Sequence, residues 1–300
     1  MRPLTIAVLL VALACGRGSD RAPSNDTTAA AASAPGSAAA TRPSSTPWPA
    51  ALGGLLVIGG TTPRSGVLLL ADSVPDVDAL AVARGAELEL MSTTGRVGIA
   101  TIAAAEPADS AECQAWPVAR LQFGRDSVGL PWTLATRRGV ATALPTAELA
   151  SMGARDSANL VMELARLASG LAGDTNPAFR GLPMVVRAAA RFAPAAGVDA
   201  VFAEVVRRVG QEAKPLEERV AVLAERASGP GATWRATWVQ RIDGLEETIE
   251  AADLVGAITL MDGTPVLVVQ RESARGVRYE LLVRTAAGWE RRWASLWSGC

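Results

Sequence analysis

Residues 254–297, LVGAITLMDGTPVLVVQRESARGVRYELLVRTAAGWERRWASLW, decide the fold of this chain. Apolar runs alternate here with the turn-forming pairs Asp262-Gly263, Arg275-Gly276 and Ala287-Gly288. Asp-Gly between apolar runs is a strong signal for a β-hairpin. The pattern predicts strands at 233–241, 254–260, 265–271, 277–285 and 288–297, with a further turn at Asp243-Gly244. We therefore expect residues 176–300 to form an antiparallel β meander, with propeller-like or barrel-like closure as alternatives.

Five of the eight tryptophans of the chain lie in this region, in two groups spaced by four residues: Trp234 and Trp238, then Trp289, Trp293 and Trp297. Even spacing places residues on one face of a strand. Because aromatic side chains mainly supply buried area, we expect a shared aromatic core under the last strands. An exposed platform that stacks on sugar rings is the alternative.

Residues 182–226 precede the meander and are ambiguous. Val198, Val201, Phe202 and Val205 fit a helical stripe, but valine-rich runs with turn residues at short spacing favour strands. We favour two hairpin-like connections, the second placing Arg207 and Arg208 opposite Glu217 and Glu218. A helix over part of 198–226 stays open.

Residues 48–175 predict a β-rich subdomain that ends in a helix. Strands are expected at 53–60, 66–71, 86–104, 116–123 and 132–143. The helix is expected from an N-cap at Asp156 or Ser157 to Gly170, with one apolar face formed by Leu160, Val161, Leu164, Leu167 and Ala168. The fold class predicted is thus α+β and dominated by β-structure.

The N-terminus carries the pattern of a secretory signal. Arg2 precedes an apolar run at 4–14, which is too short to span a bilayer. Cys15 follows, and residues 16–47 are mostly Ala, Ser, Thr, Pro and Gly, a composition typical of a disordered tether.

Leu13, Ala14 and Cys15, followed by this tether, resemble the lipobox of bacterial lipoproteins; Ala12 stands where that family more often has Leu. The resemblance covers residues 1–47. It implies removal of a signal peptide, residues 1–14, and a lipid on Cys15. The folded body would then be extracytoplasmic, anchored to the cell membrane or the outer membrane and facing the periplasm or the exterior.

A second resemblance is confined to Ile258–Gln270, where Asp262-Gly263-Thr264-Pro265 and the following valines are similar to an FG-GAP β-propeller repeat. The loop of that family carries several aspartates that bind calcium. Only Asp262 stands here, so the resemblance does not imply a calcium site.

The amino-acid composition excludes several classes of binding and catalytic function. The chain has 29 basic and 30 acidic residues, and losing Arg2 with the signal leaves 28 against 30, a net charge of −2. This balance argues against a dedicated nucleic-acid binder. Histidine is absent, which excludes Ser-His-Asp and Cys-His catalysis and histidine-ligated zinc. The single lysine, Lys214, lies in neither a P-loop nor a Ser-x-x-Lys motif. We expect no cofactor, no metal site and no catalytic residue.

Cys113 and Cys300 remain once Cys15 carries a lipid. Two cysteines in an oxidising compartment often pair, and a disulfide here would close a long loop. Two thiols that never meet are the alternative.

Charged residues gather in two places near the C-terminus. Paired carboxylates in the acidic run Asp243, Glu246, Glu247, Glu250 and Asp253 would suit glycoside hydrolysis, whereas charges on an edge strand prevent sheet-to-sheet pairing. The candidate anion-binding residues are Arg271, Arg278, Arg284, Arg291 and Arg292, and cross-strand pairing with interleaved glutamates is the alternative.

These observations favour a cell-envelope lipoprotein that binds or scaffolds without catalysis at the membrane surface. Its expected partners are the membrane, through the lipid anchor, and an envelope protein or polymer. A carboxylate-dependent hydrolase of envelope polysaccharide is one alternative. A receptor for an anionic ligand, which would use the C-terminal arginines, is the other.

Overall fold

The computed structural model describes residues 47–60, 62–71, 77–109, 116–124, 131–171, 176–210 and 214–299. Contacts divide the chain into Met1–Arg42 and Pro43–Cys300, and the described residues all belong to the second unit. Cys15, Cys113 and Cys300 lie outside the described residues, so the lipidation site and the disulfide stay predictions. No helix among the described ranges combines the length and apolarity that a bilayer crossing requires.

The first strands form a closed six-stranded barrel in the order β1-β2-β5-β4-β3-β6. A short 3-10 helix at Ala50–Leu52 precedes it, and α1 (Val77–Ala83) lies between the second and third strands. The barrel strands are β1 (Leu55–Gly59), β2 (Ser65–Leu70), β3 (Glu87–Ser92), β4 (Gly95–Glu106), β5 (Val118–Phe123) and β6 (Leu134–Arg137). Leucine, isoleucine, alanine and Trp132 side chains fill its core.

A close approach of backbones fixes the pairing of the first two strands. Gly59 of β1 pairs with Gly66 of β2, and a Cβ at Gly66 would lie 2.3 Å from the carbonyl oxygen of Ile58. Only glycine fits this position, because a backbone atom is less able to shift than a side-chain end.

Two five-stranded sheets follow. We name each after the part of the protein that packs on its outer face, a helix for the first sheet and the barrel for the second. The helix-side sheet has the order β12-β11-β10-β9-β8, and the barrel-side sheet has the order β16-β15-β14-β13-β7. The helix-side strands are β8 (Ala147–Glu148), β9 (Val185–Ala195), β10 (Val198–Val209), β11 (Leu216–Ala227) and β12 (Arg235–Leu245). The barrel-side strands are β7 (Ala141–Ala143), β13 (Ala251–Leu260), β14 (Pro265–Ser273), β15 (Gly276–Thr285) and β16 (Gly288–Ala294).

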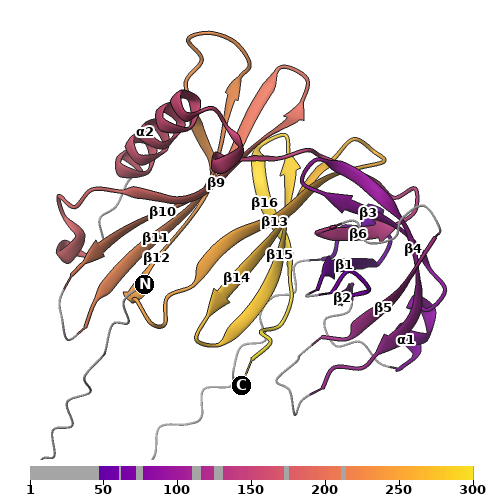
Figure 1. The fold of residues 1–300 in the computed structure, drawn as a ribbon. Helices are drawn as coiled ribbons and strands as arrows, with labels where there is room; N and C mark the ends of the chain where they lie inside the picture. The colour runs from indigo at the N-terminus through magenta and orange to yellow at the C-terminus, as the bar shows by residue number, and fades with distance from the viewer. Residues whose placement is uncertain are drawn as a thin grey trace, which may run out of the picture. The chain divides into compact units, whose positions relative to one another are not determined.

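Three apolar clusters stack these parts into layers (Figure 1). Helix α2 (Ala154–Gly170) packs Leu160 and Leu164 onto the outer face of the helix-side sheet. Phe202 and Leu267 belong to the core between the two sheets. The outer face of the barrel-side sheet packs on the barrel, where Trp116 and Tyr279 rings lie 5.2 Å apart. Short 3-10 helices at Leu149–Ser151 and Pro177–Phe179 flank α2.

Most of the predicted elements are confirmed. The protein is β-dominated, with one long helix and an antiparallel C-terminal meander, and the closed barrel is built from the N-terminal strands. Val198–Val209 and Leu216–Ala227 form strands, and Arg207 and Arg208 pair with Glu218 and Glu217 across the hairpin, as predicted.

Two local predictions are wrong. The helix begins at Ala154, before the predicted caps at Asp156 or Ser157. Gly153 is its N-cap residue and provides no side-chain hydrogen bond, and Asp156 lies in the first turn. Asp243-Gly244 is not a turn, because both residues continue β12 and pair with Glu218 and Glu217. The chain reverses after Leu245 instead.

The predicted single face of tryptophans is also wrong, because a β-bulge lies within each group. Leu223 and Ala224 of β11 pair with Trp238 and Ala236 of β12, so Thr237 is an extra residue in β12. In the same way, Leu281 and Leu282 of β15 pair with Trp293 and Arg291 of β16, so Arg292 is an extra residue in β16. One extra residue in a strand turns the following side chains to the opposite face. Trp289 therefore lies between the sheets, whereas the buried Trp293 belongs to the barrel-side core.

Candidate functional site

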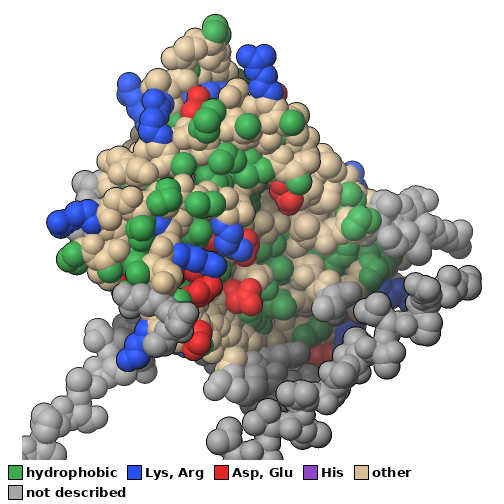
Figure 2. All heavy atoms as spheres, turned by 60° about the vertical axis from the view of Figure 1, so that its left-hand side comes forward, with side chains coloured by type: hydrophobic (Ala, Val, Ile, Leu, Met, Phe, Trp, Pro, Cys, Tyr) green, Lys and Arg blue, Asp and Glu red, His purple; other side chains and the backbone are tan. Residues whose placement is uncertain are grey.

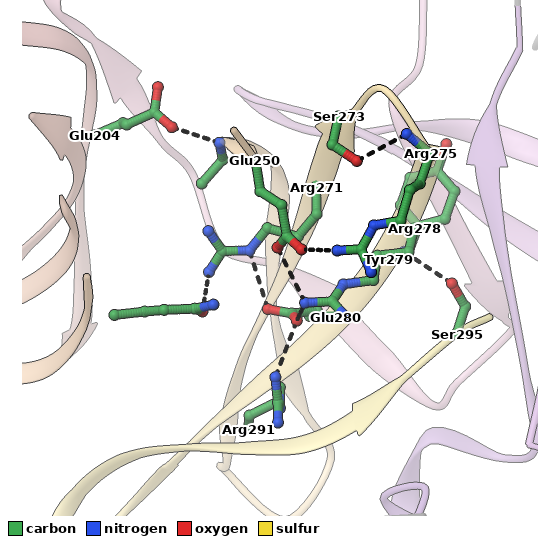
Figure 3. Close-up of polar contacts among 12 residues, drawn as sticks. Glu204, Glu250, Arg271, Ser273, Arg275, Arg278, Tyr279, Glu280, Arg291 and Ser295 are labelled. Atoms are coloured by element: carbon green, nitrogen blue, oxygen red, sulfur yellow. Dashed lines mark hydrogen bonds and ion pairs between the residues drawn. The ribbon is translucent and has the colours of Figure 1, made fainter. Parts of the chain in front are cut away.

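Three arginines meet around one buried glutamate on the inner face of the barrel-side sheet (Figure 3). Arg271 Nε lies 3.1 Å from Glu280 Oε2, and Arg278 Nη2 and Arg291 Nη1 lie 3.0 and 3.2 Å from Glu280 Oε1. The register explains the meeting. Arg271 pairs directly with Arg278, and Glu280 pairs with Val269, two residues before Arg271. Direct and diagonal neighbours on one face of a sheet are within reach of long side chains.

A second glutamate extends this group toward the surface. Glu250 lies at the entry of β13, with Oε1 2.5 Å from Arg275 and Oε2 3.3 Å from Arg278. The guanidinium carbons of both arginines lie over the ring of Trp297, 4.6 and 4.7 Å from its centroid. We call Arg271, Arg275, Arg278 and Arg291, with Glu250 and Glu280, the arginine cluster.

Charge and burial are unevenly distributed in the arginine cluster. Four guanidinium groups face two carboxylates, which leaves two positive charges in excess. The side chains of Arg271 and Glu280 are 1% and 0% exposed, and Gln240 of β12 accepts a further hydrogen bond from Arg271. Arg275 and Arg291, in contrast, are 64% and 45% exposed. The cluster thus has a fixed buried pair and two guanidiniums in contact with solvent.

The remaining predicted arginines lie elsewhere. Arg284 forms a two-pronged pair with Glu225 of β11, at 2.9 and 3.0 Å, which raises the pKa of Arg284 above its ordinary value. Trp289 also donates its indole N–H to Glu225. Arg292, the extra residue of the bulge in β16, pairs with its near neighbour Glu290, and both are well exposed. The structure therefore brings together Arg271, Arg278 and Arg291, and not Arg284 or Arg292.

Seven residues on or beside the inner face of the helix-side sheet form a chain of alternating charge that runs Asp253, Arg187, Glu204, Arg219, Glu217, Arg208 and Glu246. Its middle members Glu204 and Glu217 are buried, and its ends reach the surface. Burial raises the pKa of Glu204 above the usual glutamate value. The charge of Arg187 and the hydrogen bond that Glu204 accepts from the Ala252 N–H both lower this pKa, but the effect of burial is larger. On the face shown in Figure 2, arginine and carboxylate side chains adjoin one another among hydrophobic ones.

The opposite face of the same sheet carries a smaller group. Arg207 and Glu218 are both buried and lie 2.6 Å apart, and Arg241 reaches the other oxygen of Glu218 at 3.2 Å. The Phe179 ring lies beneath Arg207, with the guanidinium carbon 5.6 Å from its centroid. These contacts join β10, β11 and β12 beneath the end of α2, where Arg241 also donates to the carbonyl of Leu171.

The predicted acidic run is divided among separate arginines. Glu246 pairs with Arg208, Glu250 belongs to the arginine cluster, and Asp253 pairs with Arg187. Asp243 accepts a hydrogen bond from Asn176. Within the described ranges, no group of three or more Cys, Asp or Glu side chains is placed to hold a metal ion.

A cleft of about 300 Å³ opens where β9 faces the start of β13. Its lining comprises Glu148, Leu149, Ala150, Arg187, Ala188, Ala189, Ala190, Phe202, Asp253 and Leu254. The sequence did not predict a role for Arg187, which lines this cleft, or for its buried partner Glu204. The one available signal was a single carboxylate inside an apolar run, Ala200–Val206, where an unpaired charge would be costly to bury.

In comparisons with known proteins, the chain matches no protein-family model, no curated protein and no solved structure.

Proposed function

We propose that this chain is a lipid-anchored protein of the cell envelope that binds an anionic envelope polymer through the arginine cluster, without catalysing a reaction. The observation that carries the proposal is the excess of two positive charges in the cluster, with Arg275 and Arg291 open to solvent. Guanidinium groups present their N–H donors in a fork that suits phosphate and carboxylate oxygens.

The buried part of the cluster supports binding by holding the exposed part in place. Glu280 fixes Arg291 and Arg278, and Glu250 together with the Trp297 ring fixes Arg275. An arginine that is already ordered loses less side-chain entropy when a ligand arrives.

The ion pairs favour binding over glycoside hydrolysis. A hydrolase needs two carboxyl groups that flank one bond, one of them protonated. Glu250 instead accepts hydrogen bonds from Arg275 and Arg278, and Asp253 accepts one from Arg187 of the other sheet, so the two carboxylates have separate arginine partners.

The location rests on the sequence. The charged start, the short apolar run, Cys15 and the tether that follows agree with the export and lipidation of a lipoprotein. A tether of about thirty small and polar residues would hold the folded body away from the membrane surface, where it could reach a polymer.

Binding of purified protein to a phosphate polymer (polyphosphate) and to a carboxylate polymer (polygalacturonate) tests the proposal by calorimetry. We expect binding to at least one polymer, weakened by added salt. The double variant Arg275→Ala/Arg291→Ala should lose about tenfold or more in affinity, about 1.4 kcal/mol. The matched control is Arg120→Ala/Arg138→Ala, which removes two similarly exposed arginines from the barrel. Equal losses in the two double variants, or no binding of either polymer, would contradict the proposal.

A further inference from the structure

The cleft between β9 and β13 lies on the side of the two-sheet core where β8 and β7 are the edge strands. On the other side, β12 and β16 come into contact, and a Cβ on Gly288 would lie 2.8 Å from the carbonyl oxygen of Thr237. On the side of β9 and β13, Arg187 donates to Asp253 at 2.7 Å and to the carbonyl of Ala252 at 3.3 Å, and the buried Glu204 of β10 accepts the Ala252 N–H at 2.6 Å. The cleft reaches the core between the sheets at Phe202 and Leu254, which belong to its lining.

The charge of the cleft lining is negative. Glu148 and Asp253 contribute two carboxylates, and Arg187 contributes one guanidinium. That guanidinium is shared, because Arg187 also pairs with the buried Glu204 and bonds the Ala252 carbonyl. Glu148 has no ion-pair partner among the described residues, and Asp253 accepts from Arg187 through Oδ1 only. The carboxylates of Glu148 and Asp253, which line the cleft, can thus accept further hydrogen bonds from a ligand.

The rest of the lining is apolar and small. Ala188 and Ala190 leave room along β9, and Phe202 and Leu254 supply larger apolar surfaces deeper between the sheets. A volume of about 300 Å³ is at the lower end of the range for small-molecule sites. Apolar walls with a few convergent polar groups are the usual composition of such sites.

We propose that this cleft binds a small organic cation, with its ammonium or guanidinium group against Asp253 and Glu148 and its short apolar body against Phe202 and Leu254. Arg187 acts as a positioning residue, because it forms ion pairs with Asp253 at the rim of the cleft and with the buried Glu204. The site is separate from the arginine cluster and of opposite charge, so the proposal does not depend on the function proposed above.

Three probes with the same ring and different charge test this proposal: benzylammonium, benzyl alcohol and benzoate. Ligand-observed NMR titration of the purified protein should show benzylammonium binding about tenfold more tightly than benzyl alcohol and more tightly than benzoate. Added salt should weaken the binding of benzylammonium and leave that of benzyl alcohol nearly unchanged.

The variants assign the binding to the cleft. Asp253→Asn should reduce the affinity for benzylammonium about tenfold and increase that for benzoate, because Arg187 then lacks one of its two carboxylates. Glu148→Gln, at an exposed residue, should weaken benzylammonium binding without raising the affinity for benzoate. Glu246→Gln is the matched control, since it removes a carboxylate from the other end of the same charged chain and should leave all three affinities unchanged.

Equal affinities for benzylammonium and benzyl alcohol would overturn the proposal, as would binding that Asp253→Asn and Glu148→Gln leave intact. Because Asp253 and Glu148 are both at the surface, these substitutions are expected to preserve the fold, which circular dichroism checks directly. The anion-binding variants Arg275→Ala and Arg291→Ala should not change benzylammonium binding.

Discussion

Replacing Glu280 by alanine is expected to lower the free energy of unfolding by about 3–5 kcal/mol, the usual cost of removing one partner of a buried ion pair. Without Glu280, the guanidinium of Arg271 stays buried with no carboxylate partner among the described residues, next to Gln240 and the Trp238 ring, and Arg278 and Arg291 each lose a carboxylate. Urea denaturation monitored by circular dichroism measures the loss.

The control for this prediction is Glu87→Ala. Glu87 pairs with Arg138 across 3.3 Å, but both side chains are more than half exposed, and such pairs contribute at most about 1 kcal/mol. If the two substitutions cost the same, the pair of Arg271 and Glu280 is not buried as described, and the cluster lacks its fixed part.

Replacing Trp289 by alanine is expected to cost a similar amount, about 3–5 kcal/mol, as for other buried aromatic side chains. Trp289 is buried between the sheets, with its ring edge-to-face against Phe192 at 5.9 Å. Its indole N–H lies 2.7 Å from Glu225, which also pairs with Arg284, so the substitution removes both packing and a hydrogen bond across the sheets.

Trp289→Phe separates the two contributions. Phenylalanine keeps most of the apolar area and removes the donor, so its cost should be clearly smaller than that of alanine and reflect mainly the lost hydrogen bond, about 1.5–3 kcal/mol for a charged acceptor. The measurement is again urea denaturation. An alanine variant as stable as the wild type would contradict the placement of Trp289 in the intersheet core.

The periodic parts of the fold could be predicted from the sequence. Alternating apolar runs and Gly-containing turns located the strands of the meander, and opposite charges on the two sides of a predicted hairpin connection placed Arg207 and Arg208 opposite Glu217 and Glu218. Both are local properties, since the two strands of a hairpin are neighbours along the chain.

The non-local parts could not be predicted. A bulge leaves no clear sequence signal, and the extra residue in β16 moved Trp293 to the face opposite Trp289. Arg187 and Asp253 are 66 residues apart and belong to different sheets, so only the packing of the two sheets brings them together. The arginine cluster is intermediate. Arg271, Arg278 and Arg291 were among the arginines predicted from the sequence and Arg275 was not, and the choice of Arg291 over Arg292 depended on the same bulge.

The distribution of charge gives the two proposed sites different expected ligands. Excess guanidinium groups at the β14–β16 end attract anions, and excess carboxylates at the cleft attract cations. Because the net charge of the chain is only −1, long-range attraction by the whole molecule contributes little, and local geometry decides what binds.

Mass spectrometry of the protein purified from the membranes of producing cells tests the central claim, an envelope protein held by a lipid on Cys15. We predict a mature chain that begins at Cys15, lacks residues 1–14 and carries additional acyl mass on its first residue, and we predict that Cys15→Ser abolishes both changes. Recovery of an unacylated chain that still begins at Met1 from the soluble cell interior would contradict the account.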